Sequence, residues 1–354
     1  MNLFGSQSYL GIDIGTTSIK VAEIGKGKNS PELKNYGILE SYGHLERVNN
    51  AIQTSSLKLV EADTVELLKL LLKKSNFKTK NAVASIPAFS VFTALMEIPK
   101  MKKEEIDNTM QYQVKNYIPL PLSEVTFEWS VIGERQDDQG FVKQQISIIS
   151  IPNETIEKYK RVFSLAGLNL NAIEVETISL IRSVLPDDPK PALIVDIGSR
   201  STNIVAVDHK TLKHNYQTDF GGASLTQALA SGLGINTNRA EKLKKERGIS
   251  ASGGDFELST LMLPFLDAII AEVRRAKANY EKNFGNKIEQ IILSGGGSKL
   301  IGISDYFNSQ FNLPVSIGNP FSRVSYPSNV ETLIRELGPS FSVAIGLGIR
   351  EFQN

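Results

Sequence analysis

The 354-residue chain has no cysteine and only three histidines. The absence of cysteine excludes disulfides, thiolate metal sites and a cysteine nucleophile, and it fits a reducing compartment. His44, His209 and His214 have neither the spacing of zinc ligands nor the serine and aspartate partners of a hydrolase. We therefore expect all three histidines to be structural or solvent-facing.

The sequence also lacks a strong excess of charge, a signal peptide and a long hydrophobic run. Its net charge of +1 gives no global field of the kind that marks nucleic-acid binders. The start, MNLFGSQSYLG, has neither the basic region nor the apolar core of a signal peptide. The most apolar helical stretch, VELLKLLLKK, is short and carries lysines, which is typical of an amphipathic helix on a core. We expect a cytoplasmic protein that reaches a membrane only through partners.

What the sequence does contain is a motif that occurs twice. LGIDIGTTSIKVAEI and LIVDIGSRSTNIVAV align in register, and the matched pairs are Asp13 with Asp196, Gly15 with Gly198, Thr16 with Ser199, and Ser18 with Ser201. Each copy continues into two β-like runs joined by a polar turn. Either copy alone is typical of an ordinary β-turn. Two copies in register, half a chain apart, predict a duplicated α/β lobe.

A third motif is glycine-rich. The apolar run QIILS leads into Gly295, Gly296 and Gly297. Successive glycines let a backbone approach a phosphate or a flat ligand because no Cβ intervenes, but a tight strand-to-helix turn uses them equally well. Helical patterns are predicted over 171–184, 239–248 and 266–285, the last with an apolar stripe that includes Leu266 and Tyr280.

The order of these motifs resembles the ATP-binding core shared by actin, sugar kinases and the large heat-shock chaperones. The resemblance implies two lobes that close on ATP, with Mg²⁺ oriented by Asp13 from one lobe and Asp196 from the other. It implies phosphate contacts from the paired loops, ribose contacts from the 239–248 segment and an adenosine-binding turn at the glycines. The ATP-binding residues that it implies are Gly15, Thr16, Thr17, Lys20, Gly198, Ser199, Ser201, Gly221, Gly222, Glu241, Lys244, Gly295, Gly296 and Gly297.

Two of these assignments have alternatives. Glu176 matches the position that would orient an attacking water, which would make it catalytic together with Asp13 and Asp196. An acidic residue in the first turn of a helix is equally expected there because it favours the helix dipole. Lys20 either reaches the γ-phosphate side of the site or faces solvent.

The segment 81–165 distinguishes among the relatives of actin. Its runs AVASIP, VFTALMEIP, TFEWSVIGE and FVKQQISIIS predict strands, and KKEEIDNTMQYQVKNYIP and NETIEKYKRVFSLAG predict helices. Such a small α+β unit between the two loops resembles the extra subdomain of the bacterial division protein FtsA. It resembles still more that of the PilM family of type IV pilus assembly proteins, as do SIPAFSVFTALMEIPKM, YIPLPLSEVTFEW, GLNLNAIEVE and the late SGGGSKLIGISDYF segment. The ending FSVAIGLGIRE resembles the family's last helix, which packs onto the first lobe.

The resemblance implies an α/β, actin-like two-lobed ATP-binding fold of duplicated ribonuclease-H-like lobes with an inserted α+β subdomain. The implied boundaries are 1–80, 166–190 and 340–354 for the first lobe, 81–165 for the insertion, 191–225 and 286–339 for the second lobe, and 226–285 for its smaller subdomain.

The PilM resemblance implies a cytoplasmic ATP-binding scaffold with slow ATP hydrolysis or none. Such proteins recruit the N-terminal cytoplasmic tail of the inner-membrane protein PilN into a groove between the first lobe and the insertion. They join the pilus alignment complex and communicate with the pilus motor ATPases. An extended tail with a few apolar anchors would fold on binding against a strand edge or an apolar groove.

The sequence leaves two alternative functions within the same superfamily to consider. An FtsA-like division filament protein would carry an amphipathic membrane helix at its C-terminus, where this sequence reads GIREFQN. A small-molecule kinase of the same superfamily would need an acceptor-activating carboxylate, and no such motif follows the first loop.

Overall fold

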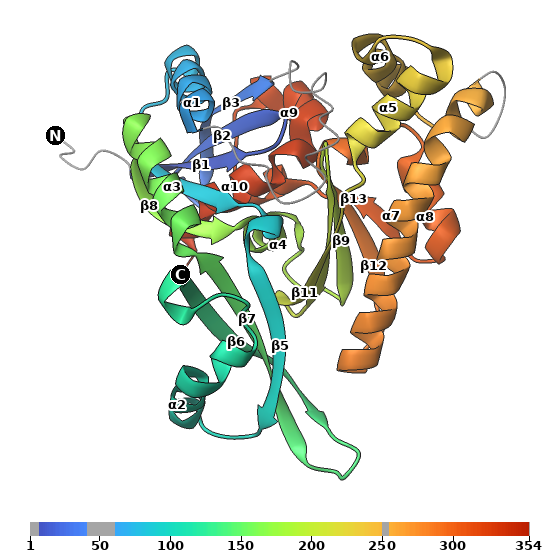
Figure 1. Cartoon of the computed structure of the whole chain (residues 1–354). Helices are drawn as coiled ribbons and strands as arrows, with labels where there is room; N and C mark the ends of the chain where they lie inside the picture. The colour runs from blue at the N-terminus through green and yellow to red at the C-terminus, as the bar shows by residue number, and fades with distance from the viewer. Residues whose placement is uncertain (1–6, 41–60, 250–254, 354) are drawn as a thin grey trace.

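The structure, a computed structural model, describes residues 7–40, 61–249 and 255–353. Within these residues, two sheets have five strands each and a third has three. Figure 1 shows the two large sheets side by side, with the small sheet and its helix projecting below them.

The first large sheet has the strand order β3-β2-β1-β4-β8. Its strands are β1 (Ser8–Ile14), β2 (Ser18–Gly25), β3 (Glu32–Glu40), β4 (Asn81–Ile86) and β8 (Asn169–Val175). The helices that pack on it are α1 (Glu61–Ser75) and α3 (Asn153–Leu165) on one face, and α4 (Glu176–Val184) and α10 (Ser342–Ile349) on the other. Strands covered on both faces explain why β1 and β4 read as continuous apolar runs.

The second large sheet repeats this arrangement with the order β11-β10-β9-β12-β13. Its strands are β9 (Ala192–Ile197), β10 (Thr202–Asp208), β11 (Thr211–Thr218), β12 (Gln290–Ser294) and β13 (Val315–Ile317). The helices near its outer face are α5 (Gly222–Leu233), α6 (Thr237–Arg247), α7 (Asp255–Phe284) and α8 (Ile303–Phe311). The predicted duplication, and with it the actin-like two-lobed fold, is confirmed.

Helix α4 lies between the two sheets. Leu180 and Val184 share one buried cluster with Val83 of the first sheet and with Ile194 and Val205 of the second. The lobes therefore pack against a common helix on their inner faces, and the residue that begins α4 lies between them.

The inserted unit is a three-stranded antiparallel sheet with one helix across it. Its elements are β5 (Phe92–Pro99), α2 (Lys103–Gln113), β6 (Val125–Gln136) and β7 (Val142–Pro152), and the strand order is β5-β7-β6. It has a core of its own, in which Met96 and Ile146 pack against Ile106 and Met110. The predicted small α+β unit is present.

The boundaries differ from the predicted ones at two places. Strand β4 and helix α3, expected within 81–165, belong to the first lobe, because β4 pairs with β1 and α3 packs on the β1 face. The segment 320–339, expected in the second lobe, packs on β2 and β3, where Phe321 and Leu33 share a cluster. Its elements are α9 (Glu331–Leu337) and the 3-10 helices η7 (Pro320–Arg323), η8 (Ser328–Val330) and η9 (Gly338–Phe341). An apolar face shows that a segment is buried but not which sheet covers it.

The helix predicted over 171–184 is wrong in its first part. Residues up to Val175 form β8, which pairs in parallel with β4, and the helix begins at Glu176. A short apolar run fits a strand or a helix locally, and here the neighbouring strand decides.

The last helix packs back onto the first lobe, as predicted. Residues of α10 share one buried cluster with Ala22 and Ile24 of β2 and another with Val83 of β4. The amphipathic helix predicted around residue 70 is α1, which buries Leu68 and Leu71. Among the described residues, no helix has the length and apolarity needed to cross a membrane.

Replacing Gly11 by alanine tests the contact between β1 and α10. A Cβ at this position would lie 2.0 Å from the Ala344 carbonyl oxygen and 2.6 Å from the Gly348 nitrogen. We expect Gly11→Ala to lower the free energy of unfolding by about 3 kcal/mol, because the backbones must separate. Urea denaturation measures this. Gly338→Ala is the control, since a Cβ there meets nothing within 4 Å, and an equal loss in both variants would contradict the argument.

Candidate functional site

The two copies of the repeated motif form loops of the same geometry. The Gly15 N–H donates to the Ser18 carbonyl at 2.9 Å, and the Gly198 N–H donates to the Ser201 carbonyl at 2.9 Å. Across each hairpin, the aspartate faces the residue seven positions later, so Asp13 pairs with Lys20 and Asp196 with Asn203. The alignment made from the sequence therefore holds in three dimensions.

The parallel strands bring the candidate catalytic residues to one edge of the sheets. Asp13 is near the carboxyl end of β1, Asp196 is near that of β9, and Glu176 follows β8 directly. In open α/β sheets this edge is where ligands bind. The structure therefore places Asp13, Asp196 and Glu176 in one region, where they interact electrostatically.

Asp13 is buried and has two side-chain partners. Lys20 Nζ lies 3.2 Å from Asp13 Oδ2, and the Ser85 hydroxyl donates to Asp13 Oδ1 at 3.2 Å. The Lys20 side chain is only 15% exposed, so the solvent-facing alternative for this residue is wrong. Its contact with phosphate stays a prediction.

Glu176 and Asp196 have strongly shifted acidities. Burial, together with Asp196 and Asp13, raises the pKa of Glu176 to about 8, against hydrogen bonds from the Ala88 N–H and from Asn203. Burial and Asp13 raise the pKa of Asp196 to about 6, and Lys20 opposes this. Both residues are half-buried. The cluster thus favours a bound cation or proton.

Glu241 and Lys244 pair with each other beside the second loop. Lys244 Nζ lies 2.6 Å from Glu241 Oε2 and donates to the Gly222 carbonyl at 2.9 Å. Burial opposes the charged form of Glu241, but Lys244 and the Thr226 hydroxyl outweigh it and hold the pKa of Glu241 below its usual range. The pair therefore joins α6 to the start of α5, and its contact with ribose stays a prediction.

The Gly221–Gly222 turn lies directly against the second loop. The Gly222 N–H donates to the Gly198 carbonyl at 2.9 Å, and a Cβ at Gly221 would lie 2.7 Å from the Ser199 carbonyl. The backbones of Gly221 and Gly222 thus contact those of Gly198 and Ser199, and their contact with phosphate stays a prediction.

The glycine-rich turn packs on the end of β9. Gly295 has φ +77°, and a Cβ on it would lie 2.7 Å from Asp196 Oδ1. A Cβ on Gly297 would lie 2.3 Å from the Ile197 side chain, whereas one on Gly296 would meet only the Ser340 hydroxyl, at 3.8 Å. The tight turn therefore explains Gly295 and Gly297, Gly296 has room for a Cβ, and the contact of the three glycines with adenosine stays a prediction.

The remaining predicted contacts, Thr16, Thr17 and Ser201, are half-buried residues of the two loops. Of the histidines, His209 is exposed beside Asp208, and His214 contacts Tyr216 with ring centroids 4.3 Å apart and ring planes tilted by 53°. His44 lies outside the described residues.

Sequence reasoning missed Ser85, Asn203 and Tyr159. Asn203 donates to Glu176 Oε1 at 2.7 Å, and its own Oδ1 is buried and has no partner among the described residues. Burial raises the pKa of the Tyr159 hydroxyl, and Glu176 and Asp13 add to this. The aligned motifs contained the signal for Asn203, because it occupies the position of Lys20 in the second copy.

The residues fit a magnesium ion that is held mainly by other ligands. Among the described residues, no group of three or more histidine and acidic side chains could hold a metal ion. Mg²⁺ characteristically takes one or two carboxylates and completes its shell with water and substrate phosphates. Asp13 and Asp196 suit that arrangement, and the buried Asn203 Oδ1 could accept a hydrogen bond from a water in the site.

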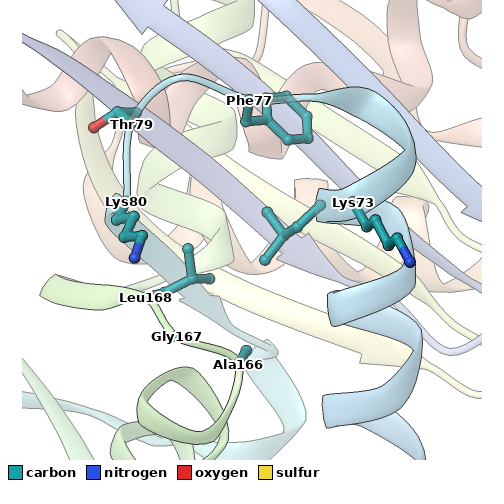
Figure 2. Close-up of a pocket in the computed structure, with 8 residues that line it drawn as sticks. Lys73, Phe77, Thr79, Lys80, Ala166, Gly167 and Leu168 are labelled. Atoms are coloured by element: carbon teal, nitrogen blue, oxygen red, sulfur yellow. The ribbon is translucent and has the colours of Figure 1, made fainter.

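A separate cavity of about 310 Å³ lies at the opposite, amino edge of the first sheet. Figure 2 shows Lys73 of α1 and Lys80, which precedes β4, on either side of it, with Phe77 and Leu168 between them. None of the predicted ATP-binding residues lines this cavity. It is therefore distinct from the carboxyl cluster.

Comparison with known protein families identifies the family of this chain. The family model described as type IV pilus assembly protein PilM matches residues 11–352. Among solved structures, a PilM-PilN type IV pilus biogenesis complex has a TM-score of 0.80 and 21% identity, covering 99% of this chain and 100% of that one. MreB 5 of Spiroplasma citri bound to AMPPNP has a TM-score of 0.53 and 14% identity, covering 99% and 97%.

Curated relatives are cell division proteins FtsA. That of Neisseria meningitidis serogroup B is 24% identical over 228 residues, which cover 57% of this chain and 53% of the relative. That of Enterococcus hirae is 22% identical over 354 residues, covering 88% and 78%. The chain thus spans about half the length of the first relative and more of the second.

The raised pKa of Glu176 predicts that stability depends on pH. Between the usual value of 4.5 and about 8, the folded state binds a proton that the unfolded state releases. The free energy of unfolding of the nucleotide-free protein therefore falls as pH rises through this window. A tenfold difference in proton affinity is worth about 1.4 kcal/mol, so Glu176→Gln, which cannot ionise, should gain on the order of 4 kcal/mol over wild type at pH 8.

Urea denaturation at several pH values measures this dependence. Glu336→Gln, at an exposed glutamate of α9, serves as the control and should keep the wild-type slope. An unchanged slope in Glu176→Gln would show that the carboxyl group is already ionised in the folded protein.

Proposed function

The chain belongs to the family of the type IV pilus assembly protein PilM, and from this we propose that it is an ATP-binding scaffold of pilus assembly. In this proposal it works in the cytoplasm and recruits the N-terminal tail of the inner-membrane protein PilN. It reaches the membrane, the alignment complex and the pilus motors through such partners. The observation that carries the nucleotide part is the pair of matching loops with Asp13 and Asp196 between two lobes.

Mg²⁺ would supply positive charge to the carboxyl cluster, and ATP would supply phosphate oxygens for the loop amides. Asp13 and Asp196 would hold waters of the metal, with Asp13 kept in place by Lys20 and Ser85. Backbone N–H groups around Thr16 and Ser199 would face the phosphates. Glu176 would orient a water, and the AMPPNP-bound state of the structurally similar MreB 5 supports a nucleotide in this fold.

The partner would bind where the inserted unit meets the first lobe. Phe89 is 40% exposed and Phe92 39% exposed, and both belong to the stretch that leads from β4 into the insertion. Strand β5 is an edge strand of its sheet. An extended tail can add to such an edge through main-chain hydrogen bonds, while apolar side chains of the tail pack against exposed apolar side chains of the protein. The PilM-PilN complex with a similar fold supports this choice of partner.

The similarity to FtsA supports a second candidate, a division filament protein. ATP-dependent sedimentation with long filaments in electron micrographs would favour that function. A monodisperse protein with ATP and Mg²⁺ would favour the scaffold.

We expect ATP and Mg²⁺ at about 100 times the dissociation constant to add about 2.7 kcal/mol of stability. For a chain of this size, this raises the melting temperature by about 4 °C. Asp196→Ala should abolish the shift while leaving the nucleotide-free protein at least as stable, because it relieves repulsion with Asp13. Asp188→Ala, at an exposed position, is the control. Absence of a shift in wild type, or its persistence in Asp196→Ala, would contradict the nucleotide assignment.

The partner groove predicts a local effect of Phe92. We expect Phe92→Ser to weaken binding of a synthetic PilN N-terminal peptide at least fivefold, because an exposed apolar anchor is lost. Calorimetric titration measures the affinity. Phe141→Ser is the matched control, since Phe141 is 67% exposed beside the turn that joins β6 and β7. Equal affinities in the two variants would place the peptide elsewhere.

A further inference from the structure

The Glu176 side chain contacts two other parts of the molecule through one oxygen atom. Glu176 begins α4 of the first lobe, and its Oε1 accepts hydrogen bonds from the Ala88 N–H at 2.8 Å and from Asn203 Nδ2 at 2.7 Å. Ala88 leads into the inserted unit, and Asn203 is on β10 of the second lobe. We name Glu176, Ala88 and Asn203 the carboxyl junction.

Ala88 is the root of the inserted unit. It follows β4 and Pro87, starts the short 3-10 helix η3 (Ala88–Ser90) and is buried. The chain leaves the inserted unit through α3. This helix carries Tyr159, whose pKa is raised by burial and further by the charge of Glu176. Both connections of the inserted unit therefore pass beside the same carboxyl group.

Asn203 links this carboxyl group to the second lobe. It is 6% exposed, and its Oδ1 has no hydrogen-bond partner among the described residues. The equivalent residue of the first loop, Lys20, pairs instead with the aspartate of its own hairpin. The duplicated position has thus been used differently in the second lobe, as a contact across the boundary between lobes.

We propose that the carboxyl junction couples the nucleotide site to the inserted unit, with Asn203 as the positioning residue that makes the coupling. The inference rests on the proposed function. When the lobes close on a nucleotide, β10 moves relative to α4, and the water held by Glu176 competes for its oxygen atoms. One oxygen then no longer serves both donors, and the Ala88 N–H must find another position. The inserted unit turns at this root, which changes its affinity for the partner peptide.

The inserted unit also contacts the second lobe away from the junction. Gln145 of β7 donates to the Asn283 carbonyl at 3.0 Å, and Lys213 of β11 donates to the Ile132 carbonyl of β6. Motion of the second lobe could reach the inserted unit through this brace. An experiment therefore has to separate the two routes.

The test measures the affinity of a synthetic PilN N-terminal peptide by calorimetry, with and without AMPPNP and Mg²⁺. Coupling between sites is typically 5- to 150-fold, and linkage requires the peptide to change nucleotide affinity by the same factor. We expect at least a fivefold change in wild type. It should fall to none in Asn203→Ala and in the near-isosteric Asn203→Leu, neither of which can donate to Glu176.

Three further variants separate a hydrogen-bonding role from others. Glu176→Gln keeps an oxygen that accepts both bonds, so the coupling should survive. Lys213→Met removes one of the two hydrogen bonds of the brace and should also preserve the coupling. Asn215→Ala, which alters an asparagine on the adjacent strand, should preserve the coupling as well. Coupling that survives in both Asn203 variants, or that is lost in Lys213→Met alone, would overturn the junction.

Hydrogen exchange of the backbone amides in 87–92 provides a readout that does not need the peptide. We expect AMPPNP and Mg²⁺ to speed exchange there in wild type and not in Asn203→Ala. Nucleotide binding with unchanged exchange would overturn the junction and leave the proposed function standing. If wild type binds neither the nucleotide nor the peptide, the proposed function fails and the junction fails with it.

Discussion

The close approach of carboxyl groups at the boundary between the two large sheets is the constraint on which the rest of the structure depends. Asp13 adds to the raised pKa values of Glu176 and Asp196, Asp196 adds to that of Glu176, and Lys20 is the nearby cation that opposes the shift of Asp196. Burying like charges is unfavourable unless they are neutralised, paired or shared with a ligand. The fold accepts this because the carboxyl ends of parallel strands meet there, which also brings backbone N–H groups to the same place.

Helix α4 connects the two lobes at that boundary. It packs between the inner faces of both sheets, so the lobes share a core and do not meet only at a hinge. Its first residue, Glu176, lies where the lobes and the inserted unit come together. A substitution of Glu176 therefore alters contacts in both lobes and at the start of the inserted unit, whereas a substitution in the far hairpin of the inserted unit does not.

The two copies of the duplicated lobe differ at the residue seven positions after the aspartate and in the insertion. The loops keep the same glycine-closed turn, but Lys20 neutralises its aspartate while Asn203 reaches across to Glu176. The insertion interrupts only the first copy, between β4 and β8. The first lobe thereby carries an additional small sheet that the second lobe lacks.

The sequence by itself determined the repeated unit, the residues of both loops and the family, because glycines, aspartates and apolar alternation are local signals. It also identified Glu176 while leaving its role open. The tertiary structure alone decided that 171–175 is a strand, that β4 and α3 belong to the first lobe, and that Lys20 is paired. It alone connected Asn203 and Ala88 to Glu176, since such contacts join residues 27 and 88 positions apart. Local pattern specifies which residues are buried, but the partner across a sheet or between lobes is set by long-range packing.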